Sequence, residues 1–202
     1  MAKIVLIPCG ENVWEFQNRF PGWINAPLTH IGKTEARTAA ASLRTLAFDL
    51  AFTSVLQRDR ETVRIILEEV GQRNVPVIED ISLNARDYGD IGGWGIDHAA
   101  AQFGQELVNA WRYSYECRPP GGESLQDVAE RAVPFFANRV LPEARSGKNI
   151  LVGIDESCLC AIVAWVHDFN PDEIMRLRIP SYTFVAYEVN CDGSIQSLAR
   201  IA

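Results

Sequence analysis

The sequence predicts an α/β fold: a three-layer sandwich with a mostly parallel central sheet and helices on both faces. Short apolar runs rich in β-branched residues begin at Ile4 and at Ile150. Each run is long enough for a buried strand but too short for a core helix. Stretches with the apolar spacing of helices lie between the predicted strands, and this alternation is typical of a sheet covered on both faces.

Length and composition indicate one domain spanning residues 1–202, because no linker rich in Ser, Gly or Pro interrupts the chain. The 48% of hydrophobic residues suffices for a sizeable core. A net charge of −7 argues against binding to nucleic acid or to anionic membranes. No apolar run is long enough for a membrane span, and the first residues do not form a signal peptide. The odd number of cysteines, 5, indicates reduced thiols and a cytoplasmic location.

The predicted elements of the first half follow in order. The first strand, residues 4–7, ends in a loop that begins with Pro8, Cys9 and Gly10. Thr29 can cap a helix over residues 30–46, which has an apolar stripe of mostly alanines. A second strand is predicted at residues 50–54, a helix from about 56 that stops near Gly71, and a third strand at residues 75–78.

The second half begins with a less regular stretch, residues 80–122. Its four glycines at 89, 92, 93 and 95 follow no convincing strand and fit neither standard phosphate-loop spacing, so a plain loop is predicted. Ser124 and Asp127 have the spacing of a capping box that opens a helix to about residue 141, with a kink at Pro134. A buried strand at 150–154, a buried helix at 157–166 and a strand at 184–189 complete the sheet.

Specific side chains gather where three of these strands end. Cys9 follows the first strand, Ser54 ends the second with Arg58 one turn into the next helix, and Asp155 follows the strand at 150–154. The carboxyl ends of parallel strands lie at one edge of a sheet, where such folds bind ligands. The sequence therefore predicts a shared crevice formed by these loops.

Several motifs along the chain match one known family. They are Asn-Arg-Phe-Pro-Gly-Trp at 18–23, Pro-Leu-Thr at 27–29, Phe-Thr-Ser-Val-Leu-Gln-Arg at 52–58, Leu-Asn-Ala-Arg-Asp-Tyr-Gly at 83–89, Trp-Arg-Tyr-Ser-Tyr at 111–115, Pro-Pro-Gly-Gly-Glu-Ser-Leu at 119–125 and the run at 172–176. With them the chain resembles cofactor-dependent phosphoglycerate mutase, of the histidine phosphatase superfamily. The resemblance covers nearly the whole chain and fits the short form, which lacks a long insertion after residue 119.

The resemblance implies phosphoryl transfer through a phosphohistidine, with 2,3-bisphosphoglycerate as cofactor, but this chain departs from the family at each catalytic position. Pro8 stands where the family has a phosphate-binding arginine, and Cys9 replaces the histidine nucleophile. Ala85 replaces the glutamate that acts as general acid and base, and Asp155 replaces the second histidine. No catalytic residue of the family is therefore intact.

Further positions of the resemblance also differ. Ile96 falls at a substrate-binding lysine, Tyr113 at a second arginine, and Pro21 at a hydroxyl residue of the family. Other positions match the family's substrate-binding residues: Asn18, Arg58, Arg86, Tyr88 and Arg112. A phosphate pocket needs arginines and oriented N–H groups, and a carboxylate beside the phosphate would cost several kcal/mol in a partly desolvated site.

We therefore expect a phosphoglycerate mutase-like pseudoenzyme with a binding or regulatory role. Its expected partner is an unidentified protein or a small molecule that is not a phosphate, and neither 2,3-bisphosphoglycerate nor a metal is expected as a cofactor. The resemblance suggests a homodimer or a higher oligomer.

Two alternatives remain. In the first, the chain is an active mutase or phosphatase in which Arg58 lowers the pKa of Cys9, so that the thiolate attacks phosphorus. Against it, Glu15 stands where the Cys-x5-Arg loop of cysteine phosphatases needs an arginine. In the second, Cys9, Asp155, Cys158 and Cys160 bind a metal. Against it, a helix turns residues 158 and 160 about 200° apart.

Overall fold

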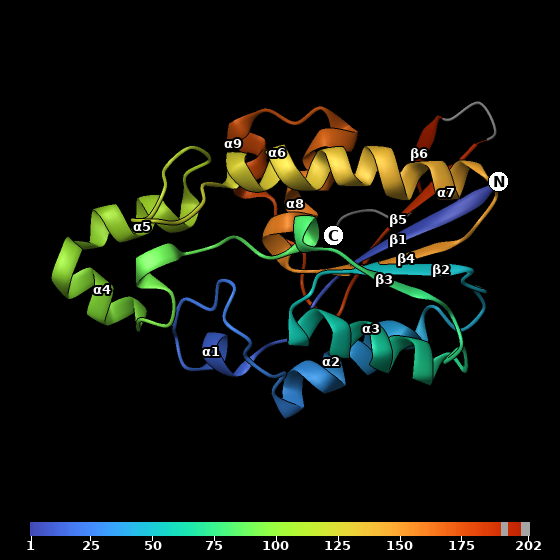
Figure 1. The fold of residues 1–202 in the computed structure, drawn as a ribbon, viewed down its shortest axis with the longest axis horizontal. Helices are drawn as coiled ribbons and strands as arrows, with labels where there is room; N and C mark the ends of the chain where they lie inside the picture. The colour runs from blue at the N-terminus through green and yellow to red at the C-terminus, as the bar shows by residue number, and fades with distance from the viewer. Residues whose placement is uncertain (191–193, 199–202) are drawn as a thin grey trace.

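A six-stranded sheet runs through the centre of the described chain (Figure 1). The structure is a computed structural model, and it describes residues 1–190 and 194–198. The strand order is β3-β2-β4-β1-β5-β6. The strands are β1 (Ala2–Pro8), β2 (Leu50–Thr53), β3 (Val77–Glu79), β4 (Ile150–Ile154), β5 (Val185–Val189) and β6 (Ile195–Ser197). The first four are mutually parallel, and β5 and β6 are antiparallel to their neighbours, which confirms the mostly parallel sheet.

Strand β1 shows why its apolar run is unbroken. Ile4 and Leu6 belong to one hydrophobic cluster, whereas Val5 and Ile7 belong to another on the opposite face of the sheet. Successive side chains of a strand point to opposite faces, so a strand that is covered twice needs apolar residues at every position. The strand lies between β4, with Leu6 opposite Val152, and β5.

Helices cover both faces of the sheet, which confirms the three layers (Figure 1). Helices α2 (His30–Ala41) and α3 (Gln57–Glu69) contribute to one cluster. The other contains residues of α6 (Leu125–Phe135), α7 (Leu141–Arg145) and α8 (Glu156–His167). Two short helices, α1 (Val13–Phe16) and α9 (Pro171–Arg176), lie in the connecting segments. None of the described helices has both the length and the hydrophobicity that a bilayer crossing requires.

Several predicted boundaries need correction. Helix α2 ends at Ala41 rather than at residue 46, because residues 42–45 form a turn that still buries Leu43. Strand β3 covers Val77–Glu79 instead of residues 75–78. The capping box of Ser124 is confirmed. Pro134 lies inside α6 and is followed by a π-helical turn, η3 (Phe136–Val140), and by α7, so helical structure continues to Arg145.

The stretch at residues 80–122 contains more regular structure than its sequence predicts. Two 3-10 turns, η1 (Ile81–Leu83) and η2 (Gly89–Ile91), are followed by α4 (Ile96–Phe103) and α5 (Gln105–Tyr113). Helices α4 and α5 extend away from the sheet (Figure 1), and their own small cluster of buried residues includes Phe20 and Trp111. The four glycines at 89–95 lie in η2 and in the connection to α4, which agrees with the predicted loop.

A close backbone approach positions the loop after β1. A Cβ atom on Gly10 would lie 2.2 Å from the carbonyl oxygen of Gly32 in α2, so only glycine fits here. The Cys9 N–H donates to the carbonyl of Ile154 at 2.9 Å, and the Gly10 N–H donates to Thr62 Oγ1 at 3.3 Å. The loop is therefore packed between α2, α3 and the end of β4.

Candidate functional site

A buried ionic cluster lies where β1, β2 and β4 end. Arg58 has no exposed surface, and its Nη2 donates to the Gly22 carbonyl at 2.8 Å. The same nitrogen lies 3.6 Å from Asp155 Oδ2. Burial disfavours the charge of Arg58, but Asp59 and Asp155 outweigh burial and raise its pKa. The Asp59 carboxylate accepts a short hydrogen bond from Ser54. Arg58 is thus a charged group held inside the protein by partners of its own.

Asp155 has a structural role at the start of α8. Its side chain caps the helix, because Oδ1 accepts from the Ser157 N–H at 3.0 Å and from Ser157 Oγ at 2.6 Å. Ser157 Oγ in turn accepts from the Arg86 N–H at 3.1 Å. Asp155, which the resemblance places at the family's second histidine, therefore connects Arg58, α8 and the segment around Arg86.

Cys9 lies beneath the surface, with 7% of its surface exposed. Burial, together with the negative charges of Asp59 and Asp155, raises the pKa of its thiol well above the ordinary value, although Arg58 acts in the opposite direction. Arg58 therefore acts on the thiol in the direction that the cysteine-nucleophile alternative requires, but the net pKa of Cys9 is raised instead of lowered. The carboxylates that neutralise Arg58 also cancel its effect on the thiol.

An open pocket of about 400 Å³ lies next to the buried cluster. Four of the five residues predicted from the family's substrate site contribute to its lining: Asn18, Arg86, Tyr88 and Arg112. So do the replaced positions Pro21, Ala85, Ile96, Tyr113 and Asp155. Residues far apart in the sequence thus converge as the resemblance implies. The lining does not include Pro8, Cys9 or Arg58, which are buried.

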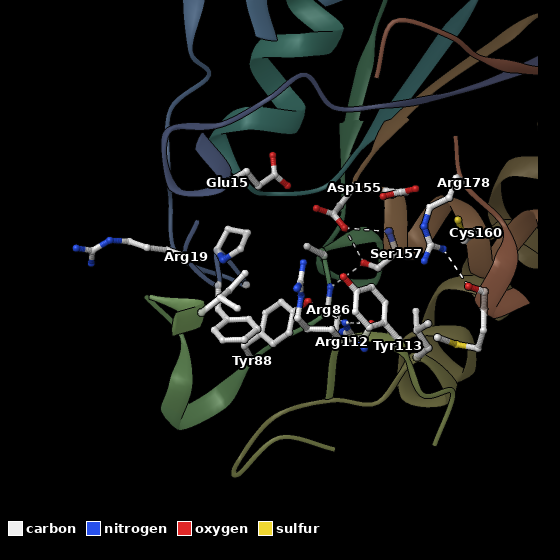
Figure 2. Close-up of a pocket in the computed structure, with 18 of the residues that line it drawn as sticks. Glu15, Arg19, Arg86, Tyr88, Arg112, Tyr113, Asp155, Ser157, Cys160 and Arg178 are labelled. Carbon is white, nitrogen blue, oxygen red and sulfur yellow. Dashed lines mark hydrogen bonds between the residues drawn. The ribbon is translucent and has the colours of Figure 1, made fainter. Parts of the chain in front are cut away.

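Arginines form one side of the pocket (Figure 2). Arg86 is 5% exposed, and its guanidinium stacks over the Tyr88 ring at 4.8 Å. Its Nη2 donates to Tyr88 Oη at 2.8 Å and to the Arg112 carbonyl at 3.1 Å. Within the described chain, Nε and Nη1 of Arg86 have no acceptor. Arg178 lines the pocket on the other side, level with Asp155 in Figure 2, and Arg19 extends away from the other labelled side chains.

Carboxylates form the opposite side. Glu15 and Asp155 lie above Arg86 and Arg112 in Figure 2, and Glu156 is a third carboxylate of the lining. Glu15 is on the exposed rim, but its carboxyl points into the pocket, where burial and Asp155 raise its pKa from 4.5 to about 7. Burial raises the pKa of Asp59, behind the pocket, from 3.8 to about 6, and Asp155 adds to this effect.

These raised pKa values predict that stability falls as the pH increases. Between pH 4.5 and about 7 the native state keeps a proton on Glu15 that the unfolded chain has released. Glu15→Gln should therefore gain stability relative to the wild type across this window, as measured by urea unfolding at several pH values. The matched control Glu69→Gln removes an exposed carboxylate that pairs with Arg37 on the surface. A stability difference between Glu15→Gln and wild type that stays constant with pH would contradict the prediction.

Sequence reasoning missed two contributors to the site. Ser157 bridges Asp155 and Arg86, and its position at the start of the helix predicted over residues 157–166, two residues after Asp155, was the available signal. Arg178 follows α9 in a segment without periodicity, so no pattern marked it.

The cysteines predicted for a metal site do not come together. Cys158 is fully buried in the core and is absent from the lining of the pocket, whereas Cys160 contributes to it. Over residues 1–190 and 194–198, no group of three or more His, Cys, Asp or Glu side chains could hold a metal ion. The structure thus gives no support to the metal-binding alternative.

The fold and the convergence of these positions define a class of protein. The model of the histidine phosphatase superfamily (branch 1) matches residues 4–200, and the chain belongs to this family.

Within the family the chain is phosphoglycerate mutase-like. It is 40% identical over 198 residues to the 2,3-bisphosphoglycerate-dependent phosphoglycerate mutase 2 of Gloeobacter violaceus, covering 98% of this chain and 90% of that one. It is 39% identical over 201 residues to the 2,3-bisphosphoglycerate-dependent phosphoglycerate mutase of Nitrobacter hamburgensis, covering 98% and 97%.

Solved structures support the same fold. Bacillus stearothermophilus YhfR superposes with a TM-score of 0.87 at 23% identity, covering 99% of this chain and 96% of that one. The alpha-ribazole phosphatase of Shigella flexneri gives a TM-score of 0.83 at 25% identity, covering 99% and 97%.

Proposed function

We propose that this protein is a pseudoenzyme: a phosphoglycerate mutase-like binding protein without mutase or phosphatase activity. One observation carries the proposal. The side chain at the position of the family's nucleophile, Cys9, is buried outside the pocket, and its thiol has a raised pKa. A nucleophile must reach the phosphorus atom and be deprotonated, and Cys9 meets neither condition.

The other replaced positions support the same proposal. Ala85 lines the pocket and offers no proton, so no group at that position can protonate the leaving oxygen. Asp155 presents a negative charge where the resemblance implies a histidine. It also pairs with Arg58, the residue expected to bind phosphate. Glu15 and Glu156 add negative charge to the lining. These changes disfavour a bisphosphate ligand.

The cysteines bear on the compartment in which the protein acts. Cys9, Cys117, Cys158 and Cys160 are free thiols. Free thiols of this kind are typical of a reducing compartment, so we infer that the protein acts in the cytoplasm.

The test is an assay of the purified protein with 3-phosphoglycerate and 2,3-bisphosphoglycerate. We expect neither isomerisation nor phosphate release above the buffer control. A ligand that binds the native state stabilises it, by about 2.7 kcal/mol at a hundredfold excess over Kd. Since we expect no binding, millimolar 2,3-bisphosphoglycerate should leave the melting temperature unchanged. Cys9→Ala is the control. Turnover that this substitution abolishes would refute the proposal and support the cysteine nucleophile.

A further inference from the structure

The guanidinium of Arg86, on the basic side of the pocket, has unpaired donors. Arg86 is 5% exposed, and no acceptor in the described chain reaches its Nε or Nη1. Unpaired donors on a buried charged group are unfavourable. Arg112 lines the same side, and no described carboxylate forms an ion pair with it. Because Arg86 and Arg112 both line the pocket, an oxyanion bound there would face two guanidinium groups that have no carboxylate partner in the described chain.

The acidic side has the opposite deficit. Glu15 and Asp155 line the pocket, and Asp59 lies directly behind them. Glu156 is a fourth carboxylate at this end, and two guanidinium groups face the four: Arg58, which is buried, and Arg178 beside Glu156. Negative charge is therefore in excess at this end, and a cationic group in the pocket would offset it.

The two sides belong to one pocket, and the backbone of Arg86 is hydrogen-bonded to the start of α8, where Asp155 lies. The Arg86 N–H donates to Ser157 Oγ at 3.1 Å, and this oxygen donates to Asp155 Oδ1 at 2.6 Å. A single serine thus separates the backbone of a basic residue from an acidic side chain. The volume of about 400 Å³ is at the lower end of the range for small-molecule sites.

We propose that the pocket binds a small dipolar ligand that carries an ammonium group and an oxyanion, either carboxylate or phosphate. The ammonium group faces Glu15 and Asp155, and the oxyanion faces Arg86 and Arg112. This assignment rests on the proposed function, since it gives the non-catalytic protein its ligand.

Each half of the ligand is required for a physical reason. A bisphosphate would place its second anion against the carboxylates, and the juxtaposition of like charges is unfavourable. A simple amine would leave Arg86 without its acceptor. A molecule that carries both charges can pair with both sides of the pocket. We therefore expect the pocket to bind it more tightly than a molecule that carries only one of the two charges.

The test is calorimetric titration of the full chain with two matched sets of compounds. The carboxylate set is 4-aminobutanoate, butanoate and butylamine, and the phosphate set is O-phosphoethanolamine, ethyl phosphate and ethylamine. In at least one set, the dipolar compound should bind at least tenfold tighter than both of its truncated forms. The set that shows this preference identifies the oxyanion.

Variants then assign the two charges. Arg86→Gln should reduce the affinity for the dipolar compound to that of the amine, and Glu15→Gln should reduce it to that of the anion. Arg44→Gln, which removes an exposed arginine in the turn after α2, should bind as the wild type does. Circular dichroism checks that each variant folds, and Glu15 lies on the exposed rim, so its variant tests the proposal even if Arg86→Gln does not fold.

Two outcomes would overturn the inference: a truncated anion that binds as tightly as the dipolar compound, or no binding by any compound of either set. The turnover assay on the same preparation separates this failure from that of the proposed function. Absence of turnover together with absence of a dipolar preference refutes only the ligand, whereas turnover refutes the pseudoenzyme.

Discussion

Arg58→Met is expected to lower the free energy of unfolding by about 3–5 kcal/mol, the range for breaking a buried ion pair by removing one partner. Arg58 is completely buried, and it is the guanidinium that faces Asp59 and Asp155. Methionine fills similar space but leaves these carboxylates without a cation. It also leaves the carbonyls of Gly22 and Ile24 without their donors. Urea unfolding at pH 7.5 measures the loss.

The matched control lies two residues further along α3. Arg60 pairs with Glu79 at 3.4 Å, and both side chains are exposed, so Arg60→Met should change stability by less than about 1 kcal/mol. Adding Asp155→Asn to Arg58→Met should recover part of the loss, because it removes one unpaired charge and keeps an oxygen that can cap α8. Equal losses from Arg58→Met and Arg60→Met would show that the buried cluster does not contribute as described.

Cys9→His alone is expected not to form a phosphohistidine, which keeps activity orders of magnitude below that of a complete site. The new ring would have to fit a buried position between α2 and the end of β4. Pro8 has no N–H and fixes the backbone before it. Asp155 would repel the phosphoryl oxygens, and Ala85 would leave out a general acid worth about a hundredfold to ten-thousandfold.

Intact-mass spectrometry after incubation with 2,3-bisphosphoglycerate measures the acid-labile adduct. The comparison variant combines Pro8→Arg, Cys9→His, Ala85→Glu and Asp155→His, and Ile96→Lys and Tyr113→Arg extend it. We expect the adduct only in these combined variants. A stoichiometric adduct on Cys9→His alone would show that Arg86 and Arg112 already form a working phosphate site, and the pseudoenzyme proposal would then be wrong.

The sequence predicted the strands from β1 to β5, but it missed the edge strand β6 and the helices α4 and α5 beside the pocket. Ile4 and Ile150 begin apolar runs that only a doubly covered strand explains, and both became central strands. Helices α4 and α5 were missed because they pack mainly on each other and on Phe20, an aromatic residue about eighty positions earlier in the chain. Their short apolar stripes are buried against that distant residue, so local periodicity alone does not reveal them.

The site shows a similar division. Its convergence could be predicted, since Asp155, Ala85 and Arg86 follow from strand ends and from the resemblance, and all three line one pocket. The depth of each side chain could not. Cys9 and Arg58 were expected in the crevice, but both lie beneath it. The carbonyls of residues 22 and 24 accept hydrogen bonds from the Arg58 guanidinium, and the loop of Cys9 is packed against α2 and the end of β4. Such depth depends on loop packing that no local pattern encodes.

Asp155 makes three structural interactions, so substituting another residue for it would cost stability. It caps α8 through Ser157, pairs with Arg58, and through Ser157 anchors the segment that holds Arg86. A histidine at this position would remove a helix cap worth about 1 kcal/mol and an ionic partner at once. Under the proposed function, a stepwise route from this sequence to a catalytic site would thus begin with a loss of stability. Asp155 is in this sense entrenched, because the structure around it depends on the residue whatever the pocket binds.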